Sequence, residues 1–423
     1  MRIVVANWSS RKVGGTESYL DEIMCELSAI GHDLAFVYES DSPTNRPRIH
    51  LPQVCPTWCV AEIGKAAAVT ALRRWQPDLV YTHKLLDTAF QEEILSVAPG
   101  VLFVHDYDGL CISGSKTFKF PVYRPCSLRF GWKCLIHYFP HRCGGRSPMT
   151  MWKLFEAQSR RLRLLHRYRA LITHSSHMRA ELLKHGISVK MIYKASYLIE
   201  SSRSALQAAS ADFEEGCRVI RDQTEAVRLL FSGRMDRLKG GLVLLDALPL
   251  IAADLRRQVG LTLVGDGPDR NIWEERAKRV QALEPRVRVE FTGWLEMPRI
   301  GQLFAESTLL VMPSLWPEPF GRIGPEAGLY ALPVAAFAVG GITEWLIDGV
   351  NGYLASADPP TSVALAEAVQ KCLQDPDVYN RLRQGAFAVA RQFSLANHMS
   401  QIVGLFESVV DGSLNPVVGD HHW

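Results

Sequence analysis

The chain has 423 residues, of which 47% are hydrophobic and 22% charged, and its formal net charge is +3. This composition is that of a folded globular protein, so disordered and fibrous classes are excluded. The small net charge gives no support to a nucleic-acid binder. Because one ordinary core does not grow to this size, we expect two domains of roughly 150 to 200 residues with a cleft between them.

Hydropathy and cysteine content indicate a cytoplasmic protein. The first apolar run turns polar by Ser9, and no later window reaches the roughly 18 apolar residues of a spanning helix. The nine cysteines are an odd number, which is unusual for a secreted disulfide framework and fits a reducing compartment.

Short β-branched runs alternate with amphipathic helical patterns, which is typical of parallel α/β architecture. In the first half, a helix is expected over residues 16–31, and strands are expected at residues 2–7, 33–39, 78–83, 101–106 and 170–175. A second series of strands is expected at residues 227–234, 261–267, 287–293, 309–314, 332–338 and 352–355. The carboxyl ends of these strands should line one crevice in each half.

The change in composition between the two series predicts the domain boundaries. Residues 1–200 form an N-terminal doubly wound domain with an insert at 111–150, and residues 201–226, rich in Ser, Ala and acids, form a linker. A second doubly wound domain covers 227–395. Residues 396–423 are expected to form a helix that packs back on the first domain, followed by a tail.

Two carboxylates, Glu318 and Glu326, stand eight positions apart in "WPEPFGRIGPEAG". Pro325 suits a first helical turn, so the amides of residues 321–324 should crowd a helix N-terminus that could hold a diphosphate. Two acids cannot both ligate phosphate, and they suit hydroxyl groups of a ribose or hexose instead. The alternatives are a solvated loop acid for Glu318 and a helix-dipole partner for Glu326.

Cations follow the first strand of the second series. Arg234 and Lys239 in "GRMDRLKGG" could neutralise a leaving diphosphate without a metal, although surface charge is the plainer interpretation. In "VGDGP", Gly265 and Gly267 permit close approach of a ligand, but they lack the full dinucleotide fingerprint.

Taken in order, these motifs together with "FTGWL", "VGGITEWLIDGVNGYL", "GGTESYL" and "VHDY" resemble the retaining GT-B glycosyltransferases of the glycogen-synthase and mannosyltransferase-like superfamily, with its Glu-x7-Glu motif. The resemblance covers most of residues 227–355. It implies two Rossmann-like domains facing a cleft, with the acceptor on the N-terminal side and a UDP- or GDP-sugar held by the C-terminal domain.

The resemblance also implies roles for single residues. Arg234 and Lys239 would bind the diphosphate, Glu326 the ribose, and Glu318 the donor sugar near the reacting carbon. Other donor contacts would come from residues across both domains, namely Gly14, Gly15, Gly265, Gly321, Arg322 and Ile323. No cofactor and no catalytic metal would be required.

His105 ends a predicted strand in "VLFVHDYDG" and is the remaining catalytic candidate. A core or capping histidine is the alternative, but similar enzymes carry a histidine here that touches the donor sugar or aids the acceptor. Two Asp-x-Asp strings, at 106–108 and 375–377, could suggest a metal-dependent transferase. The string at 375–377 is better explained as a solvated turn. The string at 106–108 is better explained by His105, the candidate residue that directly precedes it.

Residues 116–169 contain thirteen Lys or Arg, a single acid and many aromatics. This mixture suits an anionic, partly apolar partner such as the inner face of a membrane with a lipid-linked acceptor. The alternative is a helix with a core face and a basic solvated face. Single-stranded nucleic acid has no other support.

Four cysteines lie in or beside the insert: Cys111, Cys126, Cys134 and Cys143. They are weak candidates for a structural zinc site, because their spacing contains no Cys-x2-Cys.

The combined interpretation is a hexosyltransferase-type, retaining enzyme of polysaccharide or lipopolysaccharide biosynthesis, with a glycan or lipid-linked acceptor. A sugar-nucleotide epimerase of similar fold and a non-catalytic sugar-nucleotide or glycan-binding protein remain alternatives.

Overall fold

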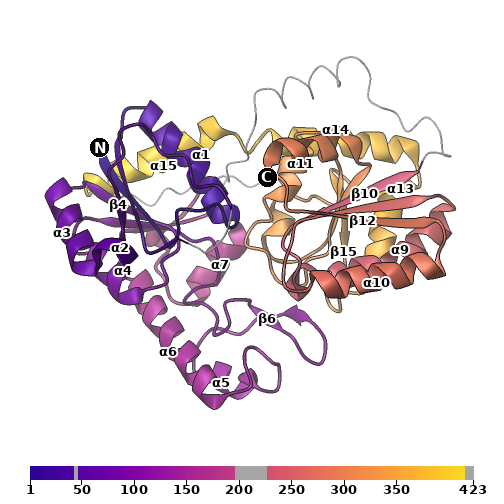
Figure 1. The fold of residues 1–423 in the computed structure, drawn as a ribbon, viewed down its shortest axis with the longest axis horizontal. Coiled ribbons are helices and arrows are strands. Elements are labelled where there is room, and N and C mark those ends of the chain that lie inside the picture. Colours follow the sequence, from indigo (N-terminus) through magenta and orange to yellow (C-terminus); the bar gives the residue numbers. More distant parts are fainter. Residues whose placement is uncertain (42–45, 196–225, 415–423) are drawn as a thin grey trace. The chain divides into compact units, whose positions relative to one another are not determined.

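A computed structural model describes residues 1–41, 46–195 and 226–414 (Figure 1). The chain divides into two compact units. The first comprises Met1–Ser115, Leu128–Leu198 and Leu395–Trp423, and the second comprises Lys116–Ser127 and Ile199–Ser394. The expected linker and tail lie largely outside the described residues. The insert is shared between the units, because residues 116–127 group with the second one.

The first unit is built on a seven-stranded parallel sheet of order β3-β2-β1-β4-β5-β8-β9. Its register pairs β1 with β2 from Arg2–Asp33 to Asn7–Tyr38. The strands are β1 (Arg2–Asn7), β2 (Asp33–Tyr38), β3 (Thr57–Cys59), β4 (Leu79–Thr82), β5 (Gly100–Phe103), β8 (Ala170–Thr173) and β9 (Ile192–Lys194). Helices cover both faces (Figure 1), so the central strands are buried along almost their whole length.

The helices of this unit include α1 and α15, which come from opposite ends of the sequence. They are α1 (Gly15–Ala29), α2 (Val60–Ile63), α3 (Lys65–Trp75), α4 (Thr88–Ile94), α5 (Lys133–Tyr138), α6 (Pro148–Leu165), α7 (Ser176–Lys184), η1 (Val189–Met191) and α15 (Leu395–Val410). One core cluster joins Val4 and Val80 of the sheet to Leu72 of α3 and Phe90 of α4, all nearly inaccessible to solvent.

The second unit contains a six-stranded parallel sheet of order β12-β11-β10-β13-β14-β15. Its strands are β10 (Val227–Ser232), β11 (Val259–Val264), β12 (Val287–Gly293), β13 (Leu309–Met312), β14 (Val334–Phe337) and β15 (Gly352–Ala355). Its helices are η2 (Arg237–Lys239), α9 (Gly241–Leu255), α10 (Arg270–Leu283), α11 (Met297–Glu306), α12 (Ile323–Gly328), η3 (Gly340–Glu344), α13 (Ser362–Leu373) and α14 (Pro376–Ala390). A small antiparallel pair, β6 (Thr117–Phe118) and β7 (Arg124–Pro125), belongs to the part of the insert in this unit.

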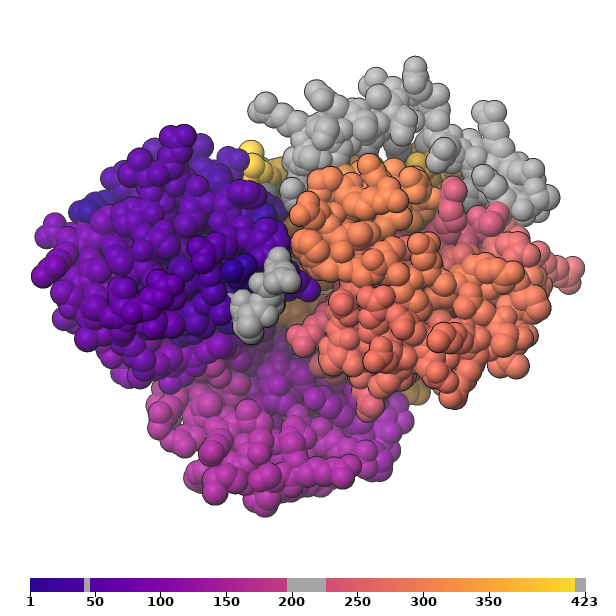
Figure 2. Space-filling view, in the orientation of Figure 1, coloured from indigo at the N-terminus to yellow at the C-terminus, as the bar shows by residue number. Residues whose placement is uncertain are grey.

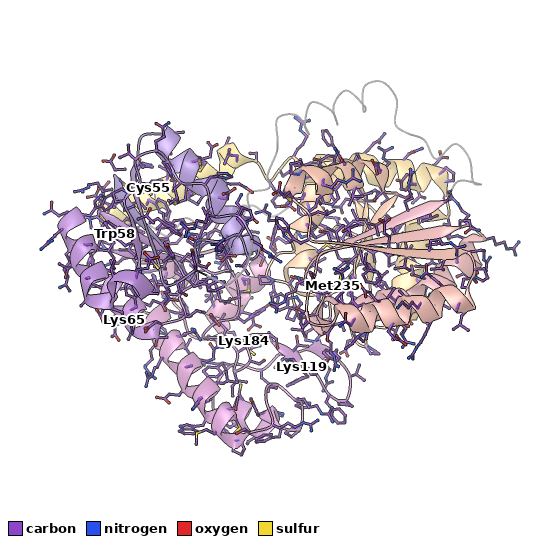
Figure 3. All side chains as sticks on the ribbon, in the orientation of Figure 1. Cys55, Trp58, Lys65, Lys119, Lys184 and Met235 are labelled. Atoms are coloured by element: carbon purple, nitrogen blue, oxygen red, sulfur yellow. The ribbon has the colours of Figure 1, made fainter. Side chains whose placement is uncertain are left out.

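The loops after β10 and β11 lie against each other through their backbones. Met235, labelled in Figure 3, accepts from the amide of Asp269 at 3.0 Å and donates to the carbonyl of Asp266 at 2.9 Å. Gly265 has φ +125°, and a Cβ there would lie 2.0 Å from the carbonyl oxygen of Gly233. The glycine is therefore required by close backbone packing at the carboxyl edge of the sheet.

We expect Gly265→Ala to lower the free energy of unfolding by about 2 kcal/mol, because it combines an unfavourable φ with a backbone clash. Gly260→Ala, in β11 itself, is the matched control. A Cβ at Gly260 meets only the carbonyl of Val227 at 3.8 Å, so this change should leave stability unchanged or raise it slightly. Urea unfolding of both variants checks the difference, and equal effects would contradict it.

Candidate active site

Glu318 is a buried carboxylate in the loop between β13 and α12, with 5% of its surface exposed. Lys239 Nζ donates to Glu318 Oε1 at 2.6 Å, and Ser314 Oγ donates to the same oxygen at 2.6 Å. The Lys239 ammonium also lies 5.5 Å from the ring centroid of Trp316. Such a charge can be buried only because a cation and a hydroxyl are both supplied to it.

The turn that carries Lys239 is held by a local cap. Asp236 accepts from the amides of Leu238 at 3.0 Å and Lys239 at 3.2 Å, which closes the short helix η2. Gly240 then takes φ +70°, where a Cβ would lie 1.8 Å from the carbonyl oxygen of Pro313. The "LKGG" segment thus brings Lys239 against the end of β13 because a glycine follows it.

The backbone of Glu318 is held by the glycine pair of "VGGITEW". The amide of Gly341 donates to the Glu318 carbonyl at 2.6 Å. Gly340 has φ +57°, and a Cβ there would be 2.3 Å from that same carbonyl oxygen. Trp345 of this motif donates from Nε1 to the carbonyl of Phe320 at 2.7 Å. The motif therefore fixes the loop that bears the carboxylate.

Glu326 forms a second, separate ion pair. It lies in the first turn of α12, its side chain is 4% exposed, and it pairs with Arg322, whose side chain is 13% exposed. A Cβ at Gly324 would lie 1.9 Å from the indole of Trp345, so this glycine lets α12 pack against that ring. Each of the two acids thus has its own basic partner.

The remaining candidates of the second unit are placed differently. The side chain of Arg234 is 70% exposed, and its Nε lies 3.7 Å from Asp236. Gly265 follows β11 at the carboxyl edge, and Gly321 takes φ +83° just before α12. The structure therefore joins Lys239 to Glu318, and leaves Arg234 without a contact to either acid.

In the first unit, His105 follows β5 and is partly exposed. Its Nε2 lies 2.9 Å from Nδ1 of His83, which follows β4 and is 5% exposed. Burial lowers the pKa of His83 to about 3. Burial, together with the nearby imidazoles of His83 and His174 and the charge of Lys84, lowers the pKa of His105 well below its usual value. Both rings are neutral at physiological pH.

A pocket of the first unit lies beside these rings, and its lining includes His83, Lys84, His105, Asp106, Asp108 and Arg161. Lys84 Nζ lies 2.6 Å from Asp106, and Arg161 Nε lies 3.7 Å from Asp108. Burial raises the pKa of Asp108, and the charge of Asp106 adds to the effect. Both acids of the first Asp-x-Asp string thus face cations. In the second string, Asp375 caps α14.

Gly14 and Gly15 are exposed at the start of α1. The amide of Gly14 donates to Glu17 Oε2 at 2.8 Å, and Trp8 Nε1 donates to Glu17 Oε1 at 2.9 Å. The buried carboxylate of Glu17 therefore orients the glycine turn. Sequence reasoning missed Glu17 and His83. Their signals were an acid three residues after a helix N-cap, and a second histidine at a strand end.

The zinc hypothesis finds no support in the part of the chain that the structure describes. There, no three or more His, Cys, Asp or Glu side chains come together as a metal site. The thiols make local contacts instead: Cys134 Sγ lies 4.0 Å from the carbonyl of Arg129, and Cys143 Sγ lies 3.7 Å from that of His137. Cys126 belongs to the other unit from Cys111, Cys134 and Cys143.

We expect Lys239→Met and Glu318→Gln to be coupled in stability by about 1–3 kcal/mol, because Glu318 is buried and Lys239 partly buried, and each single change leaves the other group without its partner. The exposed pair Arg276–Asp246, with 43% and 39% of the side chains exposed, is the control and should couple by less than about 1 kcal/mol. Denaturant unfolding of both double-mutant cycles measures this. Strict additivity at Lys239 and Glu318 would contradict it.

Two family models match the chain, one in each half. Residues 13–195 match Glycosyltransferase Family 4, and residues 226–375 match Glycosyl transferases group 1. Among curated proteins, the chain is 24% identical over 421 residues to a glycogen synthase of Mycobacterium tuberculosis, covering 91% of this chain and 89% of that protein. It is 29% identical over 196 residues to D-inositol 3-phosphate glycosyltransferase 1 of Catenulispora acidiphila, covering 44% of this chain and 46% of the relative. That match spans less than half the length of the relative.

Solved structures confirm the expected fold. Anabaena Alr3699/HepE in complex with UDP has a TM-score of 0.67 at 21% identity, covering 96% of this chain and 100% of that one. WaaG, a glycosyltransferase involved in lipopolysaccharide biosynthesis, has a TM-score of 0.64 at 16% identity, covering 99% and 100%. The two family models, one in each half of the chain, support a place in the group 1 glycosyltransferase superfamily, and the solved structures show the GT-B fold.

Proposed function

We propose that this protein is a retaining glycosyltransferase that moves a hexose-type sugar from a UDP- or GDP-sugar to a glycan, lipid-linked or surface-polysaccharide acceptor. The observation that carries the proposal is the buried carboxylate of Glu318, held by Lys239 and Ser314 at one oxygen. A carboxylate beside a fixed cation can accept hydrogen bonds from sugar hydroxyls while the cation faces a departing diphosphate.

In this proposal the bond between the anomeric carbon and the diphosphate oxygen breaks, and a bond to the acceptor oxygen forms on the same face. The acceptor hydroxyl gives up its proton to the departing diphosphate. Negative charge grows on the leaving oxygen. Lys239 and the exposed Arg234 neutralise that charge, and the amides of residues 321–323 hold phosphate oxygens. Two cations at one strand edge supply the charge that the diphosphate needs, so the reaction as proposed requires no catalytic metal.

Glu326 is assigned to the ribose. Its carboxylate is buried in the first turn of α12 and paired with Arg322, so its orientation is set before a donor binds. From the first unit, Gly14 and Gly15 would approach the donor diphosphate, since their exposed backbone carries no side chain. His105 would contact the transferred sugar or the acceptor.

We expect Glu318→Gln to lower kcat by about 10²-fold with little change in donor affinity, because it removes charge where the transition state needs it. Glu326→Gln should instead weaken donor binding by about 10- to 100-fold, the effect of losing a charge-assisted hydrogen bond. Calorimetry and steady-state kinetics with a panel of UDP- and GDP-sugars measure both.

Glu275→Gln is the control, because Glu275 makes only an exposed pair with Arg279. Equal effects of the two site variants on kcat and affinity would overturn the assignment. Donor turnover that gives an epimerised nucleotide sugar without an acceptor product would favour the epimerase. Donor binding with no turnover would favour a binding protein. A product of inverted anomeric configuration, read by proton NMR, would contradict retention.

We also propose that the first unit contacts the inner leaflet of a membrane through α5 and the start of α6, drawn in magenta in Figure 2. Large apolar side chains are exposed there: Trp132 at 65%, Ile136 at 60%, Phe139 at 43%, Met149 at 64% and Trp152 at 56%. Lys133, Arg146 and Lys153 are interleaved with them. Aromatic and basic side chains on one surface match an anionic lipid interface. No helix among the described residues is long and apolar enough to cross a bilayer.

We expect the double variant Trp132→Ser/Trp152→Ser to lose about tenfold or more of its binding to vesicles that contain phosphatidylglycerol. Leu283→Ser is the control, since Leu283 is 83% exposed in the second unit. Vesicle sedimentation, with pure phosphatidylcholine vesicles for comparison, measures the effect. Unchanged binding of the double variant, or equal binding to both vesicle types, would contradict the proposed surface.

A further inference from the structure

The hydrogen bond between His83 and His105 determines which nitrogen of His105 can meet a substrate. It occupies Nε2 of His105. The other nitrogen, Nδ1, has no hydrogen-bond partner among the described residues and is absent from the buried unpaired atoms, so it reaches the surface. At the far end of the pair, Nε2 of His83 is buried and has no partner. The four ring nitrogens thus form a line from the core to the surface.

Two neutral rings carry two protons, so this line has two arrangements. In one, His83 donates from Nδ1 to His105 Nε2, and His105 carries its proton on the outward Nδ1. In the other, His105 donates from Nε2, and His83 carries its proton on the buried, unpartnered Nε2. Buried N–H groups without an acceptor are rarer than under-satisfied acceptors. The first arrangement therefore has the lower free energy.

We propose that His83 is a positioning residue that holds His105 in the Nδ1–H tautomer, so that His105 donates a hydrogen bond to a substrate oxygen instead of accepting a proton. For the identity of that oxygen, the inference rests on the proposed function: it belongs to a hydroxyl group of the transferred sugar or of the acceptor. No bond is made or broken at His105. The imidazole orients an oxygen, and the leaving diphosphate is stabilised elsewhere, by Lys239 and Arg234.

The surroundings keep this pair neutral and in place. Phe103 of β5 packs on His105 with ring centroids 4.5 Å apart, and Tyr81 of β4 packs edge-on against His83 at 4.4 Å. From α1, Tyr19 contacts both imidazoles. The ionisable groups that face the pair are these two tyrosines, Lys84 with Asp106, and the buried His174. Burial opposes protonation of both rings, and the charge of Lys84 adds to the effect at His105.

Nitrogen-15 NMR of histidine-labelled full-length protein tests the tautomer directly and needs no enzymatic activity. Protonated and bare ring nitrogens resonate in separate ranges, and a His105→Gln spectrum assigns the His105 signals. We expect Nδ1 of His105 to be protonated and Nε2 bare. His83→Asp, whose carboxylate oxygen occupies the place of Nδ1 and can only accept, should shift His105 toward the Nε2–H tautomer. His83→Asn, whose amide nitrogen occupies the place of Nδ1 and can donate, should keep the Nδ1–H tautomer.

His185→Phe is the control for the loss of a buried histidine elsewhere in the unit. His185 is another buried histidine of the first unit, and its Nε2 accepts from the amide of Phe130 at 2.8 Å. Its loss should leave the His105 signals unchanged. A wild-type His105 with Nε2 protonated and Nδ1 bare overturns the proposal. So does a His83→Asp spectrum in which the tautomer is unaltered.

Kinetics then test the consequence. We expect His83→Asp to lower kcat about tenfold or more with little change in the donor KM, and His83→Asn to recover most of the loss. A loss shared equally by the two variants would show a structural role only and contradict positioning. If the NMR result holds and no transfer occurs with any donor, the proposed function fails while the tautomer assignment stands.

Discussion

The ion pair between the partly buried Lys239 and the buried Glu318 is the interaction on which the candidate site of the second unit depends. A carboxylate with 6% of its side chain exposed would be strongly unfavourable alone, and the 2.6 Å contact with Lys239 offsets part of that cost. Bringing the two charged side chains together also constrains the backbone around them. Gly240 allows the turn that carries Lys239 to lie against the end of β13, while Gly340 and Gly341 pack closely against the backbone of the loop that carries Glu318. Three glycines are thus placed by one charge pair.

The positions of most parallel strands along the chain could be predicted from the sequence, because strands buried on both faces read as short β-branched runs between helical patterns. Strands β3 (Thr57–Cys59) and β9 (Ile192–Lys194) were missed, since three residues carry no periodicity. The contact of Lys239 with Glu318 spans 79 positions. The sequence identified both residues as donor candidates by resemblance, but only the fold shows that they are partners. The same limit applies to Arg234, whose exposure no local pattern revealed.

The histidines show a different limit. A histidine at the end of β5 could be singled out from its position, and the same reasoning applied to β4 would have found His83. That the two rings meet at 2.9 Å depends on the pairing of β4 with β5, which brings their carboxyl ends together. The proposed chemistry thus uses loops at strand ends in both units. Rigid parallel sheets hold the strands, and the residues that follow them carry the function.

A crystal structure of the protein with an unreacted sugar nucleotide tests the central claim most directly. The account predicts that the diphosphate lies against Lys239 and Arg234, that Glu318 accepts from hydroxyls of the sugar, and that Glu326 accepts from the ribose. A donor bound in the second unit with its ribose at Glu318, or with its diphosphate away from Lys239, would contradict the account.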